Sequence, residues 1–269
     1  MEEGGRIESD PSANSTDIFS VGEELLSLED ALSLIDKLFT DLAEEKMSIG
    51  EARRISRSLT REATGFHHLI EGIHNKRWFS QKLEEEIDRS RREKSPLTII
   101  SLDLDGFKAV NDRLGHLAGD KTLKDTGVIL LNMARRRIDS VAGMGGDEFA
   151  ILLPTTDSIH GLVVAIKILK AIPSISPLDL DAGKIIPITV SIGVAEFSAD
   201  ETAESFLERA DRALYRVKQG DKNSIGFAPK NPQFTMDNLK TALEEIDIEP
   251  GIKAQTISDI IDKTTLAHT

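Results

Sequence analysis

Apolar positions in the first quarter of the chain recur at helical spacing. Residues 1–20 are polar and acidic, which predicts a disordered tail. Leu, Ile and Phe then repeat every three or four positions over Leu25–Leu42, as on one face of an amphipathic helix. Ser48 and Glu51 form a capping-box pattern that opens a second helix. Residues 21–66 are therefore predicted to form a helical hairpin. Its apolar stripe packs on the next domain or on a second copy of the chain, and a ligand-sensing module is the alternative.

After this hairpin the apolar pattern alternates between helical and strand periods. The predicted helices are one that Asn75 caps, Leu117 to about Arg135, Ile159–Ala171 and Ala203–Lys218. The predicted strands are Leu97–Asp103, Ile138–Ala142, Glu148–Leu153, Ile185–Val194 and Ser224–Ala228. This order predicts an α/β (α+β) domain over residues 67–228, with a central mixed sheet that is flanked by helices and contains an antiparallel hairpin. Residues 229–269 form a C-terminal extension with two weaker helical patterns, Asp237–Ile246 and Thr256–Leu266.

The composition narrows the classes of partner. The 269 residues carry a formal net charge of −13, which argues against a nucleic-acid partner because phosphate binding rewards positive charge. The chain has no cysteine, so disulfides and thiolate metal sites are excluded, and a reducing cytoplasm fits. No apolar run approaches the length that spans a bilayer, and Met1–Asp10 lacks the features of a signal peptide. We therefore expect a cytoplasmic protein with no membrane partner.

Carboxylates gather at two places in the predicted domain. Asp103 and Asp105 end a strand that is otherwise apolar, where unpaired charge is costly to bury without a cation. Asp147 and Glu148 follow two glycines at the tip of a predicted hairpin, which a bulky ligand can approach closely. If the hairpin lies beside the strand, the carboxylates converge into a site for divalent cations, for which Mg²⁺ with a nucleoside triphosphate is the usual occupant. Each piece alone also has a structural interpretation, as a helix cap and as a common turn.

The segment Gly145–Phe149 spells the signature of the GGDEF family of diguanylate cyclases, and Asp103–Asp112 resembles the metal and substrate segment of that family. The resemblance covers about Leu69 to Phe227 with its order and spacing kept. Further matching positions are Gly72–Phe79, Gly115, His116, Gly119, Asp120, Ser191–Val194, Ala210, Asp211, Ala213, Tyr215, Lys218 and Asn223. The resemblance implies a fold like the palm of adenylyl cyclases and polymerases. It also implies a homodimer that condenses two GTP, one per subunit, into cyclic di-GMP and two pyrophosphates.

The resemblance further implies a role for individual residues. It places two Mg²⁺ ions per active site, with Mn²⁺ as a substitute, on Asp103, the Leu104 carbonyl, Asp147 and Glu148. Asp147 takes the position that helps to deprotonate the ribose 3′-hydroxyl, and Lys108 stabilises the charge that develops on the attacked phosphate. The implied substrate-binding residues are Gly106, Phe107, Lys108, Asn111, Asp120, Gly145, Gly146, Lys218 and Lys222. The family usually has Arg at position 222, and Lys supplies the charge without the bidentate fork.

Two further matches concern the choice of base and inhibition by the product. Asn111 and Asp120 match the guanine-reading positions, and a carboxylate accepts from guanine N1–H and its 2-amino group, which adenine does not match. Outside the resemblance, these two residues read equally as a helix cap and a solvated helix residue. Arg136 and Asp139 lie in register with the RxxD inhibitory site of the family, where product binds. The alternative is a solvated basic helix end.

Two departures from the family pattern leave room for a second function. The family commonly has Asp at the position of His68 and Arg at the position of Gly143, and these can form a salt bridge in relatives. Both partners are replaced here, so no orphan charge remains, but Gly143 loosens the strand that feeds the hairpin. A catalytically weak receptor for cyclic di-GMP is therefore the alternative to an active cyclase. A mixed GMP–AMP product is a third reading, against which Asp120 argues.

Overall fold

The computed structural model describes Lys37 and residues 72–135, 137–231, 233–245 and 250–267. The predicted tail and helical hairpin, together with His68 and Arg136, lie outside the described residues. Predictions about them therefore remain predictions.

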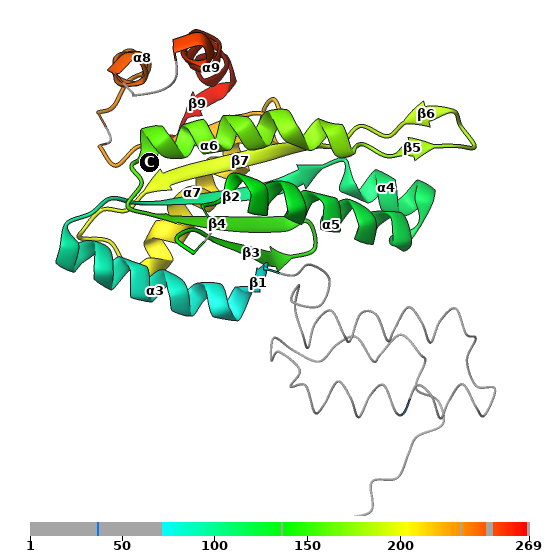
Figure 1. Ribbon diagram of the computed structural model, residues 1–269, viewed down its shortest axis with the longest axis horizontal. Helices are drawn as coiled ribbons and strands as arrows, with labels where there is room; N and C mark the ends of the chain where they lie inside the picture. Colours follow the sequence, from blue (N-terminus) through cyan, green and yellow to red (C-terminus); the bar gives the residue numbers. More distant parts are fainter. Residues whose placement is uncertain (1–36, 38–71, 136, 232, 246–249, 268–269) are drawn as a thin grey trace, which may run out of the picture. The chain divides into compact units, whose positions relative to one another are not determined.

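A seven-stranded mixed sheet forms the centre of the described domain, in the order β1-β3-β4-β2-β7-β8-β9 (Figure 1). The strands are β1 (His74–Asn75), β2 (Leu97–Asp105), β3 (Ser140–Gly145), β4 (Glu148–Pro154), β7 (Thr189–Glu196), β8 (Ile225–Ala228) and β9 (Thr264–Leu266). A separate hairpin consists of β5 (Leu178–Asp179) and β6 (Lys184–Ile185). β2 runs antiparallel to both of its neighbours, whereas β1–β3, β7–β8 and β8–β9 are parallel pairs. The predicted mixed sheet with its antiparallel hairpin is confirmed.

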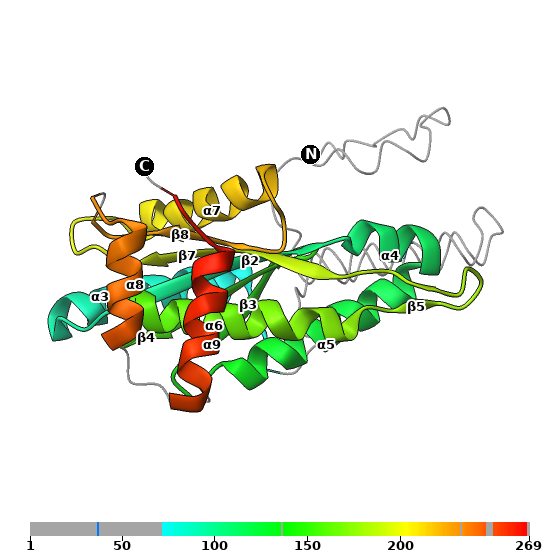
Figure 2. The same ribbon diagram turned by 90° about the horizontal axis from the view of Figure 1, so that it is seen from above.

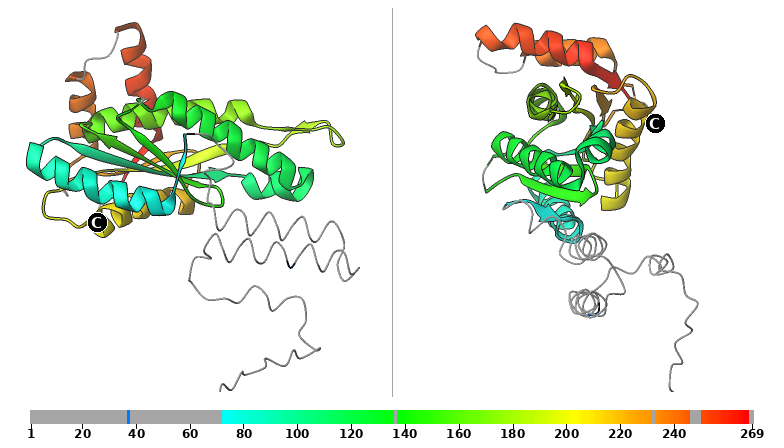
Figure 3. Two further views of the ribbon diagram at one scale, coloured as in Figure 1. Left: turned by 60° about the horizontal axis from the view of Figure 1, so that its bottom comes forward. Right: turned by 90° about the vertical axis from the view of Figure 1, so that its right-hand side faces the viewer.

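Helices cover both faces of this sheet. α5 and α6 lie on one face and α3 and α7 on the other, as the views in Figures 2 and 3 show. The helices are α3 (Lys76–Glu93), α4 (Phe107–Leu114), α5 (His116–Met133), α6 (Ser158–Ala171) with the 3₁₀ turn η3 (Ile172–Ile175), α7 (Ala203–Gln219), α8 (Met236–Glu245) and α9 (Pro250–Lys263). α8 and α9 pack on α6, so the C-terminal extension adds to the domain. The expected flanking of the sheet by helices is confirmed.

The central strand β2 separates two apolar cores and carries the acidic residues between them. All nine of its residues are buried. Leu102 and Leu104 pack into the core beneath α5 and α6, and Ile99 packs into the core beneath α3 and α7. Because side chains alternate along a strand, Asp103 and Asp105 face the same side as Ile99, which is the side of α7.

The predicted cap of the first described helix is confirmed. The Asn75 side-chain oxygen accepts a hydrogen bond from the Trp78 amide at 2.8 Å, as an N-cap residue does. Phe79, Leu83 and Ile87 then follow at helical spacing and are fully buried against the sheet. The sequence of α3 therefore specifies both its first turn and its buried face.

Two predicted elements differ from the structure. The strand predicted over Ile185–Val194 is split, because Pro187 has no amide hydrogen to donate, and the long strand begins only at Thr189. The second C-terminal helical pattern was predicted to run to Leu266, but α9 stops at Lys263. The following residues form β9, which extends the sheet beside β8.

The stretch Ser158–Ile175 is long and apolar enough, by length and composition alone, to cross a membrane, which corrects the expectation that no apolar run has that length. Half of it is buried inside the domain. Its buried side chains, such as Leu162 and Ile166, pack against the sheet in the core beneath α5 and α6. Its apolar character is that of a core helix.

Candidate active site

The β3–β4 hairpin brings the two acidic clusters together at the end of β2. In the antiparallel register of β2 and β4, Asp103 lies directly opposite Glu148. The Leu104 amide donates to the Asp147 carbonyl oxygen at 3.3 Å, which holds the hairpin tip beside the strand. The structure therefore brings together the three carboxylates that the sequence predicts for a metal site.

The hairpin tip depends on the backbone freedom of its two glycines. Gly145 has a φ of 142° and Gly146 a φ of 57°, and both values lie where residues with a Cβ are strained. A bulge between Gly143 and Gly145 shifts the register just before the tip. No atom lies within 4 Å of a Cβ built on either Gly145 or Gly146, so the turn leaves open space beside the carboxylates.

The carboxylates at this site repel one another. Desolvation raises the pKa of Asp147, and the nearby charge of Asp103 adds to the rise. Partial burial raises the pKa of Glu148, and Asp103 again contributes. Asp103 itself is only 5% exposed, so water screens its charge poorly. A bound cation would relieve this repulsion, which is the electrostatic condition that a divalent metal site requires.

The donor chemistry of the site fits Mg²⁺ that arrives with a nucleotide. Asp103, Asp147 and Glu148 supply oxygen ligands, and the Leu104 carbonyl lies in the same strand. Within the described residues, no group of three acidic or histidine side chains is already gathered closely enough to hold an ion by itself. Mg²⁺ usually takes one or two protein carboxylates and completes its shell with water and substrate phosphates, so a partial set of protein ligands is what such a site needs.

Lys218, in the last turn of α7, contacts this cluster directly. Its ammonium nitrogen lies 2.6 Å from Oδ2 of Asp103. Partial burial acts to lower the pKa of Lys218, but the bond to Asp103 and the charges of Asp147 and Glu148 outweigh it, and the pKa is raised. The ammonium balances part of the negative charge of the cluster. The predicted contact of Lys218 with a terminal phosphate requires it to leave Asp103, and it stays a prediction.

The link between β2 and α4 has the features of a phosphate-binding turn. Gly106 has a φ of 86°, and a Cβ at this position would lie 2.7 Å from the Pro187 carbonyl oxygen, so only glycine fits. The first turn of α4 has no side-chain cap, which leaves its amides available to an anion. Phe107 is buried, and Lys108 and Lys222 are exposed in the two segments that follow β2 and α7.

The two predicted guanine-reading residues lie at the contact of α4 with α5. A Cβ on Gly119 would overlap the Asn111 side chain, so the absence of one lets that side chain lie flat against α5. Asp120 is the next residue, half-buried in the first turns of α5. The structure therefore brings Asn111 and Asp120 to one place, and their contact with a base stays a prediction.

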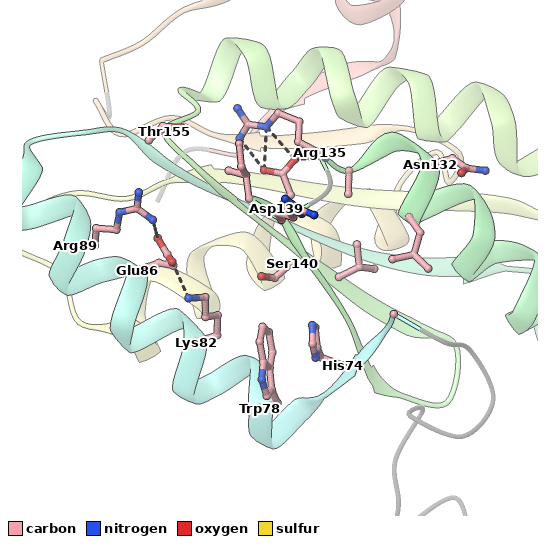
Figure 4. Close-up of a pocket in the computed structure, with 16 residues that line it drawn as sticks. His74, Trp78, Lys82, Glu86, Arg89, Asn132, Arg135, Asp139, Ser140 and Thr155 are labelled. Atoms are coloured by element: carbon pink, nitrogen blue, oxygen red, sulfur yellow. Dashed lines mark hydrogen bonds and ion pairs between the residues drawn. The ribbon is translucent and has the colours of Figure 1, made fainter.

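Asp139, the acidic half of the predicted inhibitory site, lines a pocket of about 710 Å³ (Figure 4). Its side chain is only 2% exposed and accepts from Arg135, through the backbone amide at 2.6 Å and a guanidinium nitrogen at 2.7 Å. The same guanidinium donates to the Pro154 carbonyl and the Thr156 hydroxyl, both at 2.7 Å. Arg135 thus joins the end of α5 to the end of β4, and Asp139 holds its guanidinium in place. Arg136 lies outside the described residues.

The wall of this pocket opposite Asp139 belongs to β1 and α3. The rings of His74 and Trp78 stack there, with centroids 3.4 Å apart and planes inclined by 9° (Figure 4). Further along α3, Glu86 lies between Lys82, at 2.9 Å, and Arg89, at 3.5 Å. The pocket therefore combines an aromatic stack with cationic side chains. His74 is half-buried in β1.

Gly143 lies in a paired part of β3. It is buried and pairs with Asn75 of β1 on one side and with Phe149 of β4 on the other. The register shifts directly after it, between Gly143 and Gly145, and the expected loosening of the strand that feeds the hairpin stays a prediction.

A second hollow, of about 370 Å³, adjoins the carboxylate cluster and was not predicted from the sequence as a site. Glu148 and Lys218 line it together with Lys76, Asp211 and Tyr215. Partial burial raises the pKa of Asp211, while the Ser101 hydroxyl and the Lys76 ammonium act in the opposite direction. The signals in the sequence are the matched positions Asp211, Tyr215 and Lys218, and they do not show the hollow because its lining comes from α3, β2, the β3–β4 hairpin and α7.

Comparison with known proteins agrees with this geometry. The family model described as diguanylate cyclase, GGDEF domain, matches residues 69–224, more than half of the chain. The chain is 35% identical over 186 residues to the diguanylate cyclase DgcP of Pseudomonas aeruginosa, a match that covers 64% of this chain and 27% of that protein. It is 38% identical over 146 residues to diguanylate cyclase A of Treponema denticola, covering 54% of this chain and 38% of the relative. The chain thus spans well under half of the length of these relatives.

Solved structures show the same fold. The GGDEF domain of DgcB from Caulobacter crescentus, in complex with c-di-GMP, is 28% identical, with a TM-score of 0.54 over 58% of this chain and 91% of that chain. The coiled coil and GGDEF domain of the same protein give 25% identity and a TM-score of 0.55, covering 71% of this chain and 98% of that one. With the mixed sheet, the glycine hairpin and the family match in agreement, the chain belongs to the GGDEF diguanylate cyclase family.

Proposed function

We propose that this protein is an active diguanylate cyclase, which joins two GTP molecules into cyclic di-GMP and releases two pyrophosphates. The observation that carries the proposal is the register of β2 and β4, which sets Asp103 opposite Glu148 and beside Asp147. The relatives DgcP and diguanylate cyclase A bear the name of this activity. The alternative is a catalytically weak receptor, whose support is the departure from the family pattern at His68 and Gly143.

The residues of the chain divide the work between substrate binding and proton transfer. Asn111 and Asp120 read the guanine, the turn at Gly106 holds phosphate oxygens, and Lys108 neutralises charge on the attacked phosphate. Asp147 lies beside Asp103 at the position proposed to accept the proton of the attacking 3′-hydroxyl. Two Mg²⁺ ions held by Asp103, the Leu104 carbonyl, Asp147 and Glu148 would supply activation of the hydroxyl and stabilisation of the leaving pyrophosphate.

The reaction needs two copies of the chain. Each GTP supplies one hydroxyl nucleophile and one α-phosphate, so two sites that each hold one GTP must face each other. The glycine turn and its open space, described above, leave room at the hairpin tip for the second nucleotide. We propose a cytoplasmic homodimer in which residues 21–66 bring two domains together.

Feedback by the product is the second part of the proposal. The pocket beside Asp139 has the size of a ligand site and offers a stacked aromatic pair for a purine and cations for phosphates. Cyclic di-GMP bound there would have to share or displace the Arg135 guanidinium that now holds Asp139. Arg136 is the second residue proposed for this site.

Product identification tests the activity. Purified protein with GTP and Mg²⁺ should form cyclic di-GMP, and the double substitution Asp147→Ala and Glu148→Ala should lower turnover at least about 10³-fold, since it removes the groups that hold the metals. The folded signal in circular dichroism should stay unchanged in this variant. ATP should replace GTP poorly, because Asp120 is then left without the guanine donors. A wild type that forms no dinucleotide at high protein concentration would contradict the proposal.

A further inference from the structure

Asp105 is a buried carboxylate for which the reaction described above has no use. It ends β2, faces the same side as Asp103 and is 7% exposed. Its Oδ2 accepts from the Thr189 hydroxyl at 3.0 Å and from the Asn223 backbone amide at 3.2 Å. Its Oδ1 accepts from the Ser191 hydroxyl at 3.0 Å. Three donors from two separate segments therefore converge on one side chain.

Asp103 and Asp105 stand two positions apart and have different partners. Asp103 pairs with the Lys218 ammonium, a mobile partner that a metal ion or a phosphate can replace. Asp105 accepts hydrogen bonds from two hydroxyls and one backbone amide, which belong to β7 and to the turn before β8. Its oxygens are occupied by the protein, so Asp105 acts as an anchor.

The segment that Asp105 anchors is the turn between α7 and β8. Asn223 adopts a left-handed conformation there, with a φ of 57°. The Ser224 hydroxyl donates to the Asp221 carbonyl at 2.6 Å, and the Ser224 carbonyl accepts from the Ile192 amide at 3.1 Å. The turn thus has a defined shape, and the bond from Asn223 to Asp105 is the one that joins it to the strand of the metal carboxylates. Lys222 is the residue next to Asn223.

We propose that Asp105 is a positioning residue, which sets the α7–β8 turn and its Lys222 at a fixed distance from Asp103 so that the triphosphate of GTP is held at its outer phosphates. This inference rests on the proposed function and concerns the same site. It predicts that Asp105 supports binding of the β- and γ-phosphates of GTP. Recognition of the base, at the far end of α4, should not depend on Asp105.

The test compares two nucleotides on one variant of the full chain. Asp105→Asn keeps the shape of the side chain, but its amide has one acceptor oxygen for three donors and adds hydrogens that oppose them. Titration calorimetry with Mg²⁺ would give the affinities for GMP and for a non-hydrolysable GTP analogue. We expect the affinity for the analogue to fall about tenfold, as loss of a charge-assisted bond implies, and the affinity for GMP to change less than about twofold. The KM for GTP should rise in parallel.

Asp179→Asn is the matched control. Asp179 is also a buried carboxylate, 9% exposed, and it accepts from the amides of Asp181 and Ala182 at 3.1 and 3.0 Å in the β5–β6 hairpin. This variant should leave both affinities unchanged. If Asp105→Asn does not fold, Thr189→Val takes its place, because it removes one donor and keeps the carboxylate. It should lower the affinity for the GTP analogue selectively, by about threefold.

Three outcomes would overturn the inference. If the affinities for GMP and for the GTP analogue fall equally, Asp105 supports the fold alone. Unchanged affinities for both would show that the turn needs no anchor. A lost affinity for Mg²⁺, with phosphate binding otherwise intact, would make Asp105 a metal ligand. Failure of the proposed function is a separate result, since the wild type would then show no preference for the triphosphate.

Discussion

Asp103, Asp147 and Glu148 concentrate negative charge at the end of one strand and the tip of one hairpin. Within the described part of the chain, Lys218 is the cation whose ion pair with this cluster is seen. Desolvation and repulsion together raise the pKa of Asp147, so the folded protein holds its carboxylate at a free-energy cost. Catalytic sites commonly keep such costs, because a site optimised for stability would lose the charge that the reaction needs.

The first prediction at this scale is that Asp147→Asn stabilises the metal-free protein at neutral pH. A carboxyl whose pKa is raised by folding favours the folded state below its unfolded pKa, and this contribution is lost as the pH rises through the folded pKa. At pH 7 the carboxylate therefore destabilises the fold, and removing its charge should raise Tm by about 2 °C. Below about pH 3 the carboxyl is protonated in both states, and the difference should disappear. Thermal melting of the metal-free protein from pH 3 to pH 8 measures both limits.

Asp200→Asn is the control, because the pKa of Asp200 is shifted in the opposite direction. Asp200 is fully exposed, and the Ser198 hydroxyl lowers its pKa, so removing this charge should not raise Tm at any pH. A Tm gain of the same size in both variants would mean that the general net charge, and not the local cluster, is responsible.

At the scale of elements, the sequence predicted those whose reasons are local. The apolar run of β2, the Asn75 cap of α3 and the glycine turn each have a signal within a few residues, and each is confirmed. The strand around Pro187 was predicted too long, because apolar content alone does not show where an amide is missing. β9 was missed because three residues carry no periodicity, and their strand conformation comes from the edge of β8, which is distant in the sequence.

In the site, too, the sequence predicted the residues of a local motif and missed contacts between separate segments. Residues within one motif, such as Asp147 and Glu148, were found from their string and its resemblance. Arg135 contacts Pro154 and Thr156, about 20 positions away, and Asp105 accepts from the Asn223 amide, 118 positions away, and pattern alone does not show such contacts.

The prediction at this scale concerns β9. Its backbone pairs with β8 over Thr264–Leu266, and the Ala267 amide donates to the Phe227 carbonyl at 2.7 Å. Ending the chain at Lys263 removes these bonds and exposes the edge of β8, which should lower Tm by about 5–10 °C. The exposed Thr265 offers the control, since Thr265→Ala keeps the backbone and should leave Tm within about 1 °C. An unchanged Tm in the truncated chain would show that β9 does not pair with β8 in solution.

At the scale of the whole molecule, the proposed homodimer would make the output depend on how two copies of the domain approach each other. A product that binds away from the carboxylates can slow the reaction by favouring one arrangement of the copies over another. The pocket of Asp139 lies against β3, α3 and the end of α5, so a ligand there would contact elements that also support the hairpin.

The prediction for this scale is product inhibition that depends on Arg136 and Arg137. Purified enzyme should retain cyclic di-GMP and slow as product accumulates. The substitution of both arginines by Ala should raise the inhibitory concentration at least about tenfold, because stacking and phosphate pairing are lost together. Asp139 should be left in place, since it holds Arg135 and the end of α5, and its removal would confuse lost binding with lost structure. Progress curves with added product, identical in the wild type and the double variant, would contradict the assignment.

The ion pair between Lys218 and Asp103 also has a consequence for how the substrate arrives. A divalent cation that approaches alone meets an ammonium already bound to one of its ligands, and a triphosphate that approaches alone meets three carboxylates. In the proposed mechanism Asp103 would hold the cation and the Lys218 ammonium would contact a phosphate oxygen, so each ligand would remove the repulsion that the other meets. The affinities for the metal and for the nucleotide are then thermodynamically linked, and each tightens the other by the same factor. We therefore expect the site to bind the nucleotide only weakly without the metal, and the metal only weakly without the nucleotide.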